Sequence, residues 1–313
     1  MAAESIIPIG RVARGSRLIA VGRMPPQVYF GLSAVFHYLG PAFAVLLFAH
    51  VAPAGVAWLR IASAATVFAL WRRPWRYFRT LDTSAQRTVA LLGAALALMN
   101  ASFYLAIARL PLGTVAALEF LGPIVLAAAG VRSARNFLAL TLASAGVYVL
   151  SDVQLRGSPL GFLFAFANCA FFMLYIIFSH RIAANGARSG IDRLGAAMLV
   201  ASVLALPLGI RDALPAFMNV SLLAAAIGVG ICSSVIPYVF DQLAMARLPR
   251  ATFSLLLALL PATATVMGIL VLRQVPSLAE IGGVLLVAGG VLLRKGNVDD
   301  RILNRRRRLP GTV

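Results

Sequence analysis

The chain of 313 residues is 61% hydrophobic and only 12% charged, with a mean hydropathy of +0.90. A soluble domain is normally about 45–50% apolar and about 25% charged, so this composition excludes a soluble globular protein and predicts an integral membrane protein. The formal net charge of +18 does not indicate nucleic-acid binding, because the basic residues lie between apolar segments and in the two tails.

Membrane-spanning helices need about 20 mainly apolar residues each. Ten such segments are predicted, at residues 28–48, 54–71, 88–108, 111–130, 136–152, 159–180, 194–210, 220–246, 249–272 and 278–294. The predicted fold is therefore an all-α membrane protein with ten transmembrane helices. Residues 1–27 form a tail without a long apolar stretch, so a cleaved signal peptide is not expected. Residues 295–313 form a second, basic tail.

The distribution of basic residues predicts the orientation of these spans. With the N-terminus in the cytoplasm, 23 of the 28 basic residues fall on the cytoplasmic side, and Arg60 lies within a span. The opposite side holds only Arg109, Arg156, Arg211 and Arg273. Because cytoplasmic loops carry the excess of Lys and Arg, both termini are predicted to be cytoplasmic.

An internal repeat divides the predicted spans into two halves. Arg109-Leu110-Pro111 returns as Arg247-Leu248-Pro249 at an offset of 138 residues, and Pro123 and Gly130 in the helix that follows return as Pro261 and Gly268. The predicted halves are residues 28–152 and 159–294, with five helices each. An odd number per half inverts the second half in the membrane, as in many secondary transporters. Duplication without transport is the alternative.

The ionisable residues well inside the predicted spans are Arg60, Glu119, Asp241 and His37, while His50, His180 and Glu280 lie nearer the span ends. Such residues are costly in a bilayer, so they usually face a cavity and mark a transport pathway. Glu119 is the strongest candidate. Pro123 has no N–H to donate to the Glu119 carbonyl four residues earlier, and a helix broken at Gly122 and Pro123 would suit a site for protons or amines. The alternative is a protonated glutamic acid bonded to a neighbouring helix.

The other candidates carry alternatives of their own. Arg60 could pair with Glu119, hold a substrate carboxylate or neutralise Asp241, and Asp241 could instead form a salt bridge with Arg247. His37 could titrate near neutral pH or be a neutral core histidine.

Polar residues and helix breaks complete the predicted pathway. Asn100 and Tyr104 are one turn apart and share a helix face, which would suit a polar cavity wall or helix–helix hydrogen bonding. Pro237 and Pro261 are the predicted helix breaks of the second half, and Tyr238 follows the first of them.

Several kinds of site are not expected. The sequence contains no phosphate-cradling glycine loop with its lysine, no His and Cys spacing typical of a metal site and no nucleophile motif. We therefore expect no enzymatic activity, no cofactor and no metal. The expected partners are a small-molecule substrate and the lipid bilayer, without nucleic acid. A homodimer stays open as an oligomeric state.

The sequence resembles the ten-helix EamA-type group of the drug/metabolite transporter superfamily, and within it the bacterial threonine/homoserine exporter branch. The resemblance spans residues 28–294 and rests on Trp58-Leu59-Arg60, the segment from Ala108 to Gly113, the run from Ala116 to Pro123, and Pro237-Tyr238. It implies a proton-coupled or exchange-type carrier of the inner membrane that expels small amino acids or related metabolites. It also implies that Arg60, Glu119 and the Pro237-Tyr238 region lie around a central cavity.

Two departures concern the coupling chemistry. The family's second half commonly has Glu-Pro in its ninth span, where this chain has Leu260-Pro261, and Gly-Glu at the end of that helix, where this chain has Arg273-Gln274. The prediction is a multi-pass exporter of the bacterial inner membrane that works by alternating access. Export of a nucleoside, purine or organic cation is the first alternative, and a scaffold or sensor that transports nothing is the second.

Overall fold

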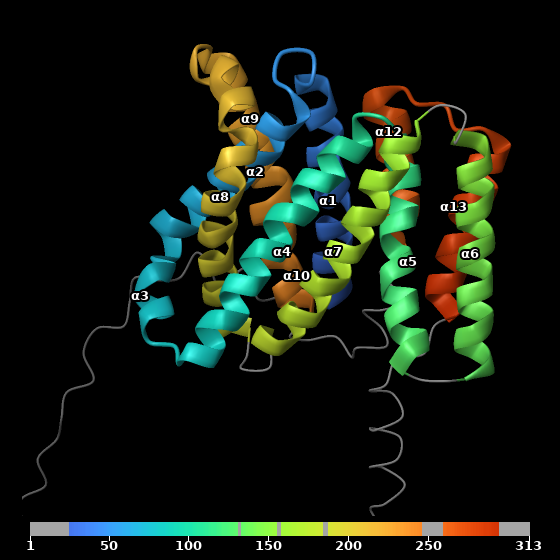
Figure 1. Ribbon diagram of the computed structural model, residues 1–313, viewed down its shortest axis with the longest axis horizontal. Helices are drawn as coiled ribbons and strands as arrows, with labels where there is room; N and C mark the ends of the chain where they lie inside the picture. The colour runs from blue at the N-terminus through green and yellow to red at the C-terminus, as the bar shows by residue number, and fades with distance from the viewer. Residues whose placement is uncertain (1–24, 131–132, 155–157, 184–186, 246–258, 294–313) are drawn as a thin grey trace, which may run out of the picture.

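The computed structural model describes residues 25–130, 133–154, 158–183, 187–245 and 259–293. Within these ranges the chain forms helices joined by short turns, and it has no β-strand (Figure 1). The helices are α1 (Pro26–Leu47), α2 (Pro53–Arg72), α3 (Pro74–Arg79), α4 (Thr83–Ile107), α5 (Leu112–Gly130), α6 (Ala134–Gln154), α7 (Pro159–Ala183), α8 (Ala187–Phe217), α9 (Val220–Gly230), the π-helix η2 (Ile231–Val235), α10 (Ile236–Met245), α12 (Leu259–Leu272) and α13 (Leu278–Leu293).

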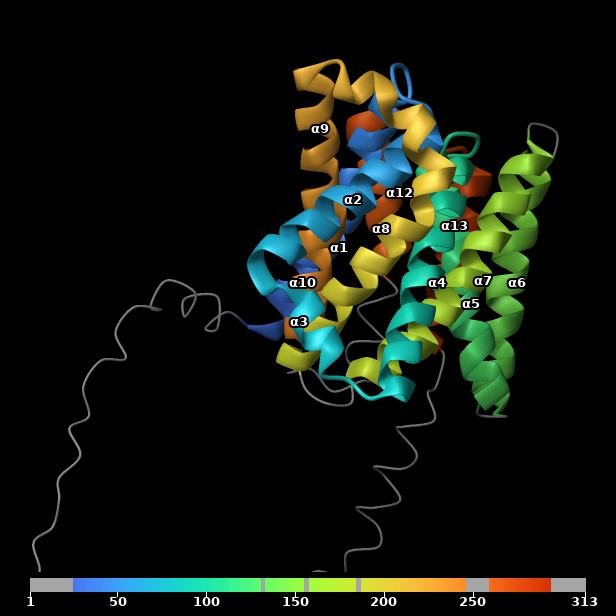
Figure 2. The ribbon, with the colours of Figure 1, turned by 60° about the vertical axis from the view of Figure 1, so that its left-hand side comes forward.

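Six helical segments are long and apolar enough to cross a membrane. They are α1, α2, α4, α7, α8 and the rod formed by α9, η2 and α10 (Figure 2). Shorter apolar helices, α5, α6, α12 and α13, occupy the other four predicted spans. The all-helical membrane architecture is thus confirmed, while the count of ten spans stays a prediction. Residues 249–258 of the predicted ninth span lie outside the described residues.

Local sequence signals explain where several helices begin. Proline opens α1 and α2, where its missing N–H costs no intrahelical bond. The Asp82 carboxylate caps α4 by accepting from the backbone N–H groups of Ser84 and Ala85. At α13, the Ser277 N–H donates to the Glu280 carboxylate and the Glu280 N–H donates to the Ser277 hydroxyl. Glu280 therefore completes a capping box.

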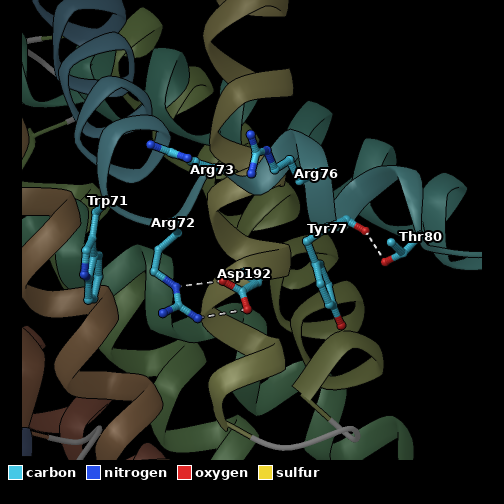
Figure 3. A pocket seen from close by; sticks show the side chains of 7 residues that line it. All are labelled: Trp71, Arg72, Arg73, Arg76, Tyr77, Thr80 and Asp192. Carbon is cyan, nitrogen blue, oxygen red and sulfur yellow. Dashed lines mark hydrogen bonds and ion pairs between the residues drawn. The ribbon is translucent and has the colours of Figure 1, made fainter. Parts of the chain in front are cut away.

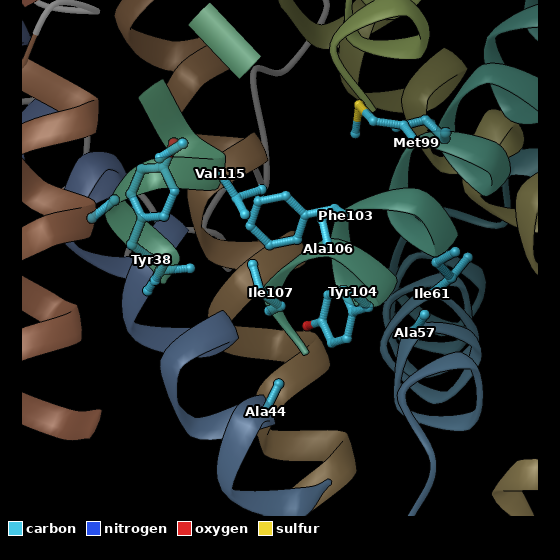
Figure 4. Close-up of a cluster of buried hydrophobic side chains, with 14 of the residues drawn as sticks. Tyr38, Ala44, Ala57, Ile61, Met99, Phe103, Tyr104, Ala106, Ile107 and Val115 are labelled. Atoms are coloured by element: carbon cyan, nitrogen blue, oxygen red, sulfur yellow. The ribbon is translucent and has the colours of Figure 1, made fainter. Parts of the chain in front are cut away.

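Packing brings together helices that are far apart in the sequence. The principal pairs are α2 with α8, α4 with α7, α6 with α13, α5 with α12, and α1 with the rod of α9, η2 and α10. Their contact faces bury one apolar core that includes Tyr38, Ile61, Phe103, Tyr104 and Ile107 (Figure 4).

The predicted start of the seventh span is wrong. Helix α8 runs from residue 187 to residue 217 and includes Asp192 and Arg193, although the predicted span began at residue 194. The helix extends further because Asp192 forms an ion pair with Arg72, which stabilises charged residues at this end. Pro41 does not interrupt α1, which is continuous from Pro26 to Leu47.

Candidate functional site

The guanidinium of Arg60 is buried and is held by two hydrogen bonds and a cation–π contact. Arg60 lies on α2 with 4% of its surface exposed. Its Nε donates to the Ser234 hydroxyl at 2.9 Å and its Nη2 donates to the Ser233 carbonyl at 2.8 Å. The guanidinium also lies 5.5 Å from the centroid of the Tyr104 ring, a cation–π distance. These contacts offset much of the desolvation cost of a buried cation.

The Ser233 carbonyl can accept a hydrogen bond from Arg60 because Pro237, four residues later, does not donate to it. Pro237 has no N–H, so it cannot donate to Ser233 in the α-helical pattern. The backbone between them forms the π-helix η2, in which Ile236 N–H donates to the Ile231 carbonyl. Single π-helical turns in α-helices occur frequently at functional sites. The predicted irregularity at Pro237 is thus a change of helix type that exposes backbone to Arg60.

Glu119 lies on α5 and is also buried, with 6% of its surface exposed. Asn168 of α7 is beside it, and Arg60 is near enough for an electrostatic interaction. Among the described residues, the ion pair that the structure shows is between Arg72 and Asp192, so the pairing of Arg60 with Glu119, one of the three possibilities for Arg60, is not formed. The two charges face the same region from different helices without neutralising each other directly.

Asp241 lies on α10, next to α1. The Ser33 hydroxyl is 2.5 Å from its Oδ1 and 3.2 Å from the Pro237 carbonyl. Asp241 is therefore held by a neutral donor and not by Arg60. The alternative partner, Arg247, lies outside the described residues.

A row of aromatic rings in mutual contact lies between α1, α7 and α10. His37 of α1 meets the Tyr238 ring edge-on at 5.9 Å between centroids, and Tyr238 stacks on Tyr175 of α7 at 6.1 Å. Tyr175 stacks in turn on Phe172 at 5.8 Å. The predicted residues His37 and Tyr238 thus belong to one aromatic wall between α1, α7 and α10.

Two buried polar atoms in this region have no hydrogen-bond partner within the described residues. Asn100 donates its amide to the Leu96 carbonyl of its own helix at 2.8 Å, which leaves its Oδ1 unpaired. The Tyr38 hydroxyl is also buried and unpaired. The Tyr104 hydroxyl interacts instead with Arg60 and Ser233, and the Asn168 side chain interacts with Glu119. Buried polar groups are nearly always satisfied, so the two unpaired atoms are candidates for contact with a polar ligand.

The predicted helix break of the first half is not an interruption. Helix α5 is continuous through Gly122 and Pro123, so the expected broken helix is wrong there. Gly122 instead permits close packing on α7, because a Cβ at this position would lie 2.7 Å from the Met173 Cγ. Pro261 lies in α12, and the residues that precede Leu259 in the predicted ninth span lie outside the described residues.

Sequence reasoning missed the serines that hold the charges: Ser33, Ser233 and Ser234. The only signal available was Pro237, whose missing N–H identifies Ser233 as the residue with a free carbonyl. Among the described residues, no group of three or more His, Cys, Asp or Glu is placed to hold a metal ion.

Comparison with known proteins gives consistent results. Residues 159–294 match the EamA-like transporter family. The threonine/homoserine exporters RhtA of Salmonella typhimurium (strain SL1344) and Escherichia coli (strain K12) are each 32% identical to this chain over 244 residues, which covers 75% of this chain and 79% of the relative. These relatives are named as exporters and the family as transporters, not as enzymes. One crystal structure matches the fold with a TM-score of 0.56 at 19% identity, over 90% of this chain and 98% of its own length.

Proposed function

This chain belongs to the EamA-like transporter family, on its threonine/homoserine exporter branch, and we propose that it is a secondary active transporter that exports small amino acids from the cytoplasm. The protein is a multi-pass membrane protein. Our proposal adds the inner membrane as its location, threonine- or homoserine-like molecules as its substrates, proton coupling and alternating access.

The observation that carries this proposal is one buried cation and one buried carboxyl group that face the same region without an ion pair. An amino acid is a zwitterion, with a carboxylate and an ammonium group on one carbon atom. The Arg60 guanidinium would bind the substrate carboxylate, because its fork of N–H donors matches carboxylate geometry. Glu119 would bind the ammonium group or, between substrates, a proton.

The surrounding polar groups fit the rest of such a substrate. The Tyr104 hydroxyl and the Asn100 Oδ1 lie on α4, and Asn168 lies beside Glu119. These polar atoms could bind a side-chain hydroxyl, which threonine and homoserine both carry. A site built to hydrogen-bond a hydroxyl discriminates strongly against analogues that lack it.

The packing pattern supports two inverted halves. If the predicted spans are numbered in order, α4 on α7 pairs the third with the sixth, and α1 on the rod of α9, η2 and α10 pairs the first with the eighth. Equivalent spans of the two halves differ by five in number, so the pair of the third and sixth spans is equivalent to the pair of the eighth and first. The pairs α2 with α8, α5 with α12 and α6 with α13 each join equivalent spans. Alternating access would then rock one half against the other around Arg60 and Glu119.

A second candidate substrate class comes from the aromatic wall. The stack of Phe172, Tyr175 and Tyr238, with His37 at its edge, offers flat faces. Such faces would suit a purine, a nucleoside or a planar organic cation. These molecules are therefore the alternative cargo.

Efflux from cells tests the proposal. Cells loaded with threonine or homoserine by dipeptide feeding would carry the wild-type protein, Glu119→Gln, Glu280→Gln or the empty vector at equal expression. We expect faster extracellular accumulation with the wild-type protein and with Glu280→Gln, because Glu280 caps α13 and is not part of the proposed pathway. Glu119→Gln should reduce export to the vector level.

Each other outcome has a defined meaning. Export that survives Glu119→Gln would contradict the role of this carboxyl group and leave the substrate assignment standing. No difference between wild type and vector would contradict the amino-acid assignment. The same cells challenged with purines, nucleosides and organic cations would then test the alternative cargo.

A further inference from the structure

An open pocket of about 460 Å³ lies at the end of α2, away from Arg60 and Glu119 (Figure 3). Its lining includes Trp71, Arg72, Arg73 and Arg76, together with Asp192 of α8. The volume is within the range of small-molecule sites, about 300–1,000 Å³. The transport pathway proposed above uses none of these residues.

The backbone at Arg73 creates this pocket. Arg73 ends α2 and precedes α3 with φ 50° and ψ 53°, a left-handed conformation that L-residues adopt rarely. The turn sends the six residues of α3 off the axis of α2. Pro74 then opens α3, as the fixed φ of proline permits. The Arg73 N–H donates to the Ala69 carbonyl, so Arg73 is a left-handed C-cap that ends α2.

The pocket lining has three arginines and one carboxylate, so positive charge is in excess. Arg72 and Asp192 form a bidentate ion pair, with Nε to Oδ1 at 2.7 Å and Nη2 to Oδ2 at 3.0 Å. Arg73 and Arg76 point away from this pair (Figure 3) and are both exposed. In the part of the chain that the structure describes, neither has a carboxylate partner. Two guanidinium groups are therefore available for an anion.

Trp71 lines the pocket, and two further apolar side chains close to it in the chain, Leu70 and Trp75, are exposed. Trp71 is 45% exposed, Trp75 on α3 is 43% exposed and Leu70 is 80% exposed. Exposed tryptophans at the end of a membrane span are typical of the membrane–water interface. A soluble anion would gain nothing from these side chains, whereas a molecule with a charged head and an acyl chain would contact both parts of the surface.

We propose that this pocket binds the headgroup of an anionic phospholipid, with Arg73 and Arg76 on the phosphate and Trp71 and Leu70 against the acyl chain. Arginine is well suited to the role, because its planar fork binds phosphate oxygens in pairs. The positive-inside distribution predicts that this end of α2 is cytoplasmic, and the cytoplasmic leaflet carries anionic lipids. The bound lipid would fix α3, and with it the connection between α2 and α4, to the membrane surface.

Lipid binding to the purified full-length protein in neutral detergent tests this proposal. Native mass spectrometry would count retained lipids, and the thermal unfolding midpoint would report stabilisation. The ligands are phosphatidylglycerol, phosphatidylcholine with matched acyl chains, and glycerol 3-phosphate as the soluble headgroup. The pocket variant is Arg73→Gln/Arg76→Gln. The control Arg79→Gln/Arg87→Gln removes the same charge from exposed arginines that do not line the pocket.

We expect the wild-type protein to bind phosphatidylglycerol about tenfold more tightly than phosphatidylcholine, because each arginine near an anionic surface contributes about 1 kcal/mol. The pocket variant should lose this preference, and the control should keep it within about twofold. Arg76→Gln alone, which leaves the turn at Arg73 intact, should lose part of it. Equal binding of both lipids, equal loss in pocket and control variants, or equal stabilisation by glycerol 3-phosphate would each overturn the proposal.

Discussion

Prolines are placed four residues after the polar residues of the candidate site. Pro41 follows His37, Pro123 follows Glu119 and Pro237 follows Ser233 at this spacing. Because proline cannot donate to the carbonyl four residues earlier, each of these residues has one backbone acceptor without its α-helical donor. In one case the acceptor is used within the protein, since Ser233 accepts from Arg60.

The hydroxyl of Ser234 provides a test of how Arg60 is held. Ser234→Ala removes one hydrogen bond to a charged group, worth about 1.5–3 kcal/mol, and should lower the export rate about tenfold or more. Ser234→Thr keeps the hydroxyl and should retain most of the rate. Ser63→Ala is the matched control, because the Ser63 hydroxyl donates only to the Arg60 backbone carbonyl. Equal rates for Ser234→Ala and Ser63→Ala would contradict the proposed anchoring.

Close helix packing depends on glycines that face a neighbouring helix. A Cβ on Gly230 would lie 2.7 Å from the Arg60 carbonyl oxygen, and one on Gly40 would lie 2.8 Å from the Ser233 backbone nitrogen. The adjacent glycines Gly289 and Gly290 of α13 differ in the same way, since only one of them faces a neighbouring helix. Gly290 packs against the backbone of Ala139 on α6, whereas an added Cβ on Gly289 would meet no atom within 4 Å.

Glycines 228 and 230 lie two positions apart on α9 and allow a paired test. Gly230→Ala should destabilise the protein by about 1–3 kcal/mol, the usual cost of overpacking, and should shift Arg60 and reduce export. Gly228→Ala meets no atom within 4 Å. It should stabilise the helix by about 0.5–1 kcal/mol, because glycine is a poor helix former. Thermal unfolding in detergent measures both changes, and equal unfolding midpoints would show that this packing is unimportant.

The sequence was sufficient to predict most elements of the fold. Apolar length predicted helices at every span that lies in the described residues, because a membrane segment must satisfy its own backbone. The cost of a buried charge identified Arg60 and Glu119, and both are buried. The partners of Arg60 could not be predicted, since they lie more than 170 residues away and depend on how α2 packs against η2. The capping role of Glu280 could have been read from Ser277 three residues earlier.

At the scale of the whole molecule, the chain is predicted to consist of two halves with opposite orientations in the membrane. The turn at Arg109 would then lie outside the cell and the related segment at Arg247 inside. The charge distribution around the spans is the basis of this prediction.

Cysteine labelling tests this topology. In a chain with Cys169 and Cys232 replaced by alanine, single cysteines would be introduced by Ala52→Cys, Ser84→Cys or Val275→Cys, all at exposed positions. In intact spheroplasts, a membrane-impermeant maleimide should label the variants at residues 52 and 275. The variant at residue 84 should react only after lysis. Labelling of residues 84 and 275 from the same side would contradict the inverted arrangement.

The most direct measurement of the central claim is counterflow in proteoliposomes. Vesicles that contain the purified protein and excess unlabelled homoserine would be diluted into labelled homoserine without a pH gradient, and then assayed again with a gradient imposed. The account predicts counterflow and gradient-driven transport for the wild-type protein, and loss of both for Arg60→Gln and for Glu119→Gln. Absence of counterflow by the wild-type protein, or transport by Arg60→Gln at the wild-type rate, would contradict it.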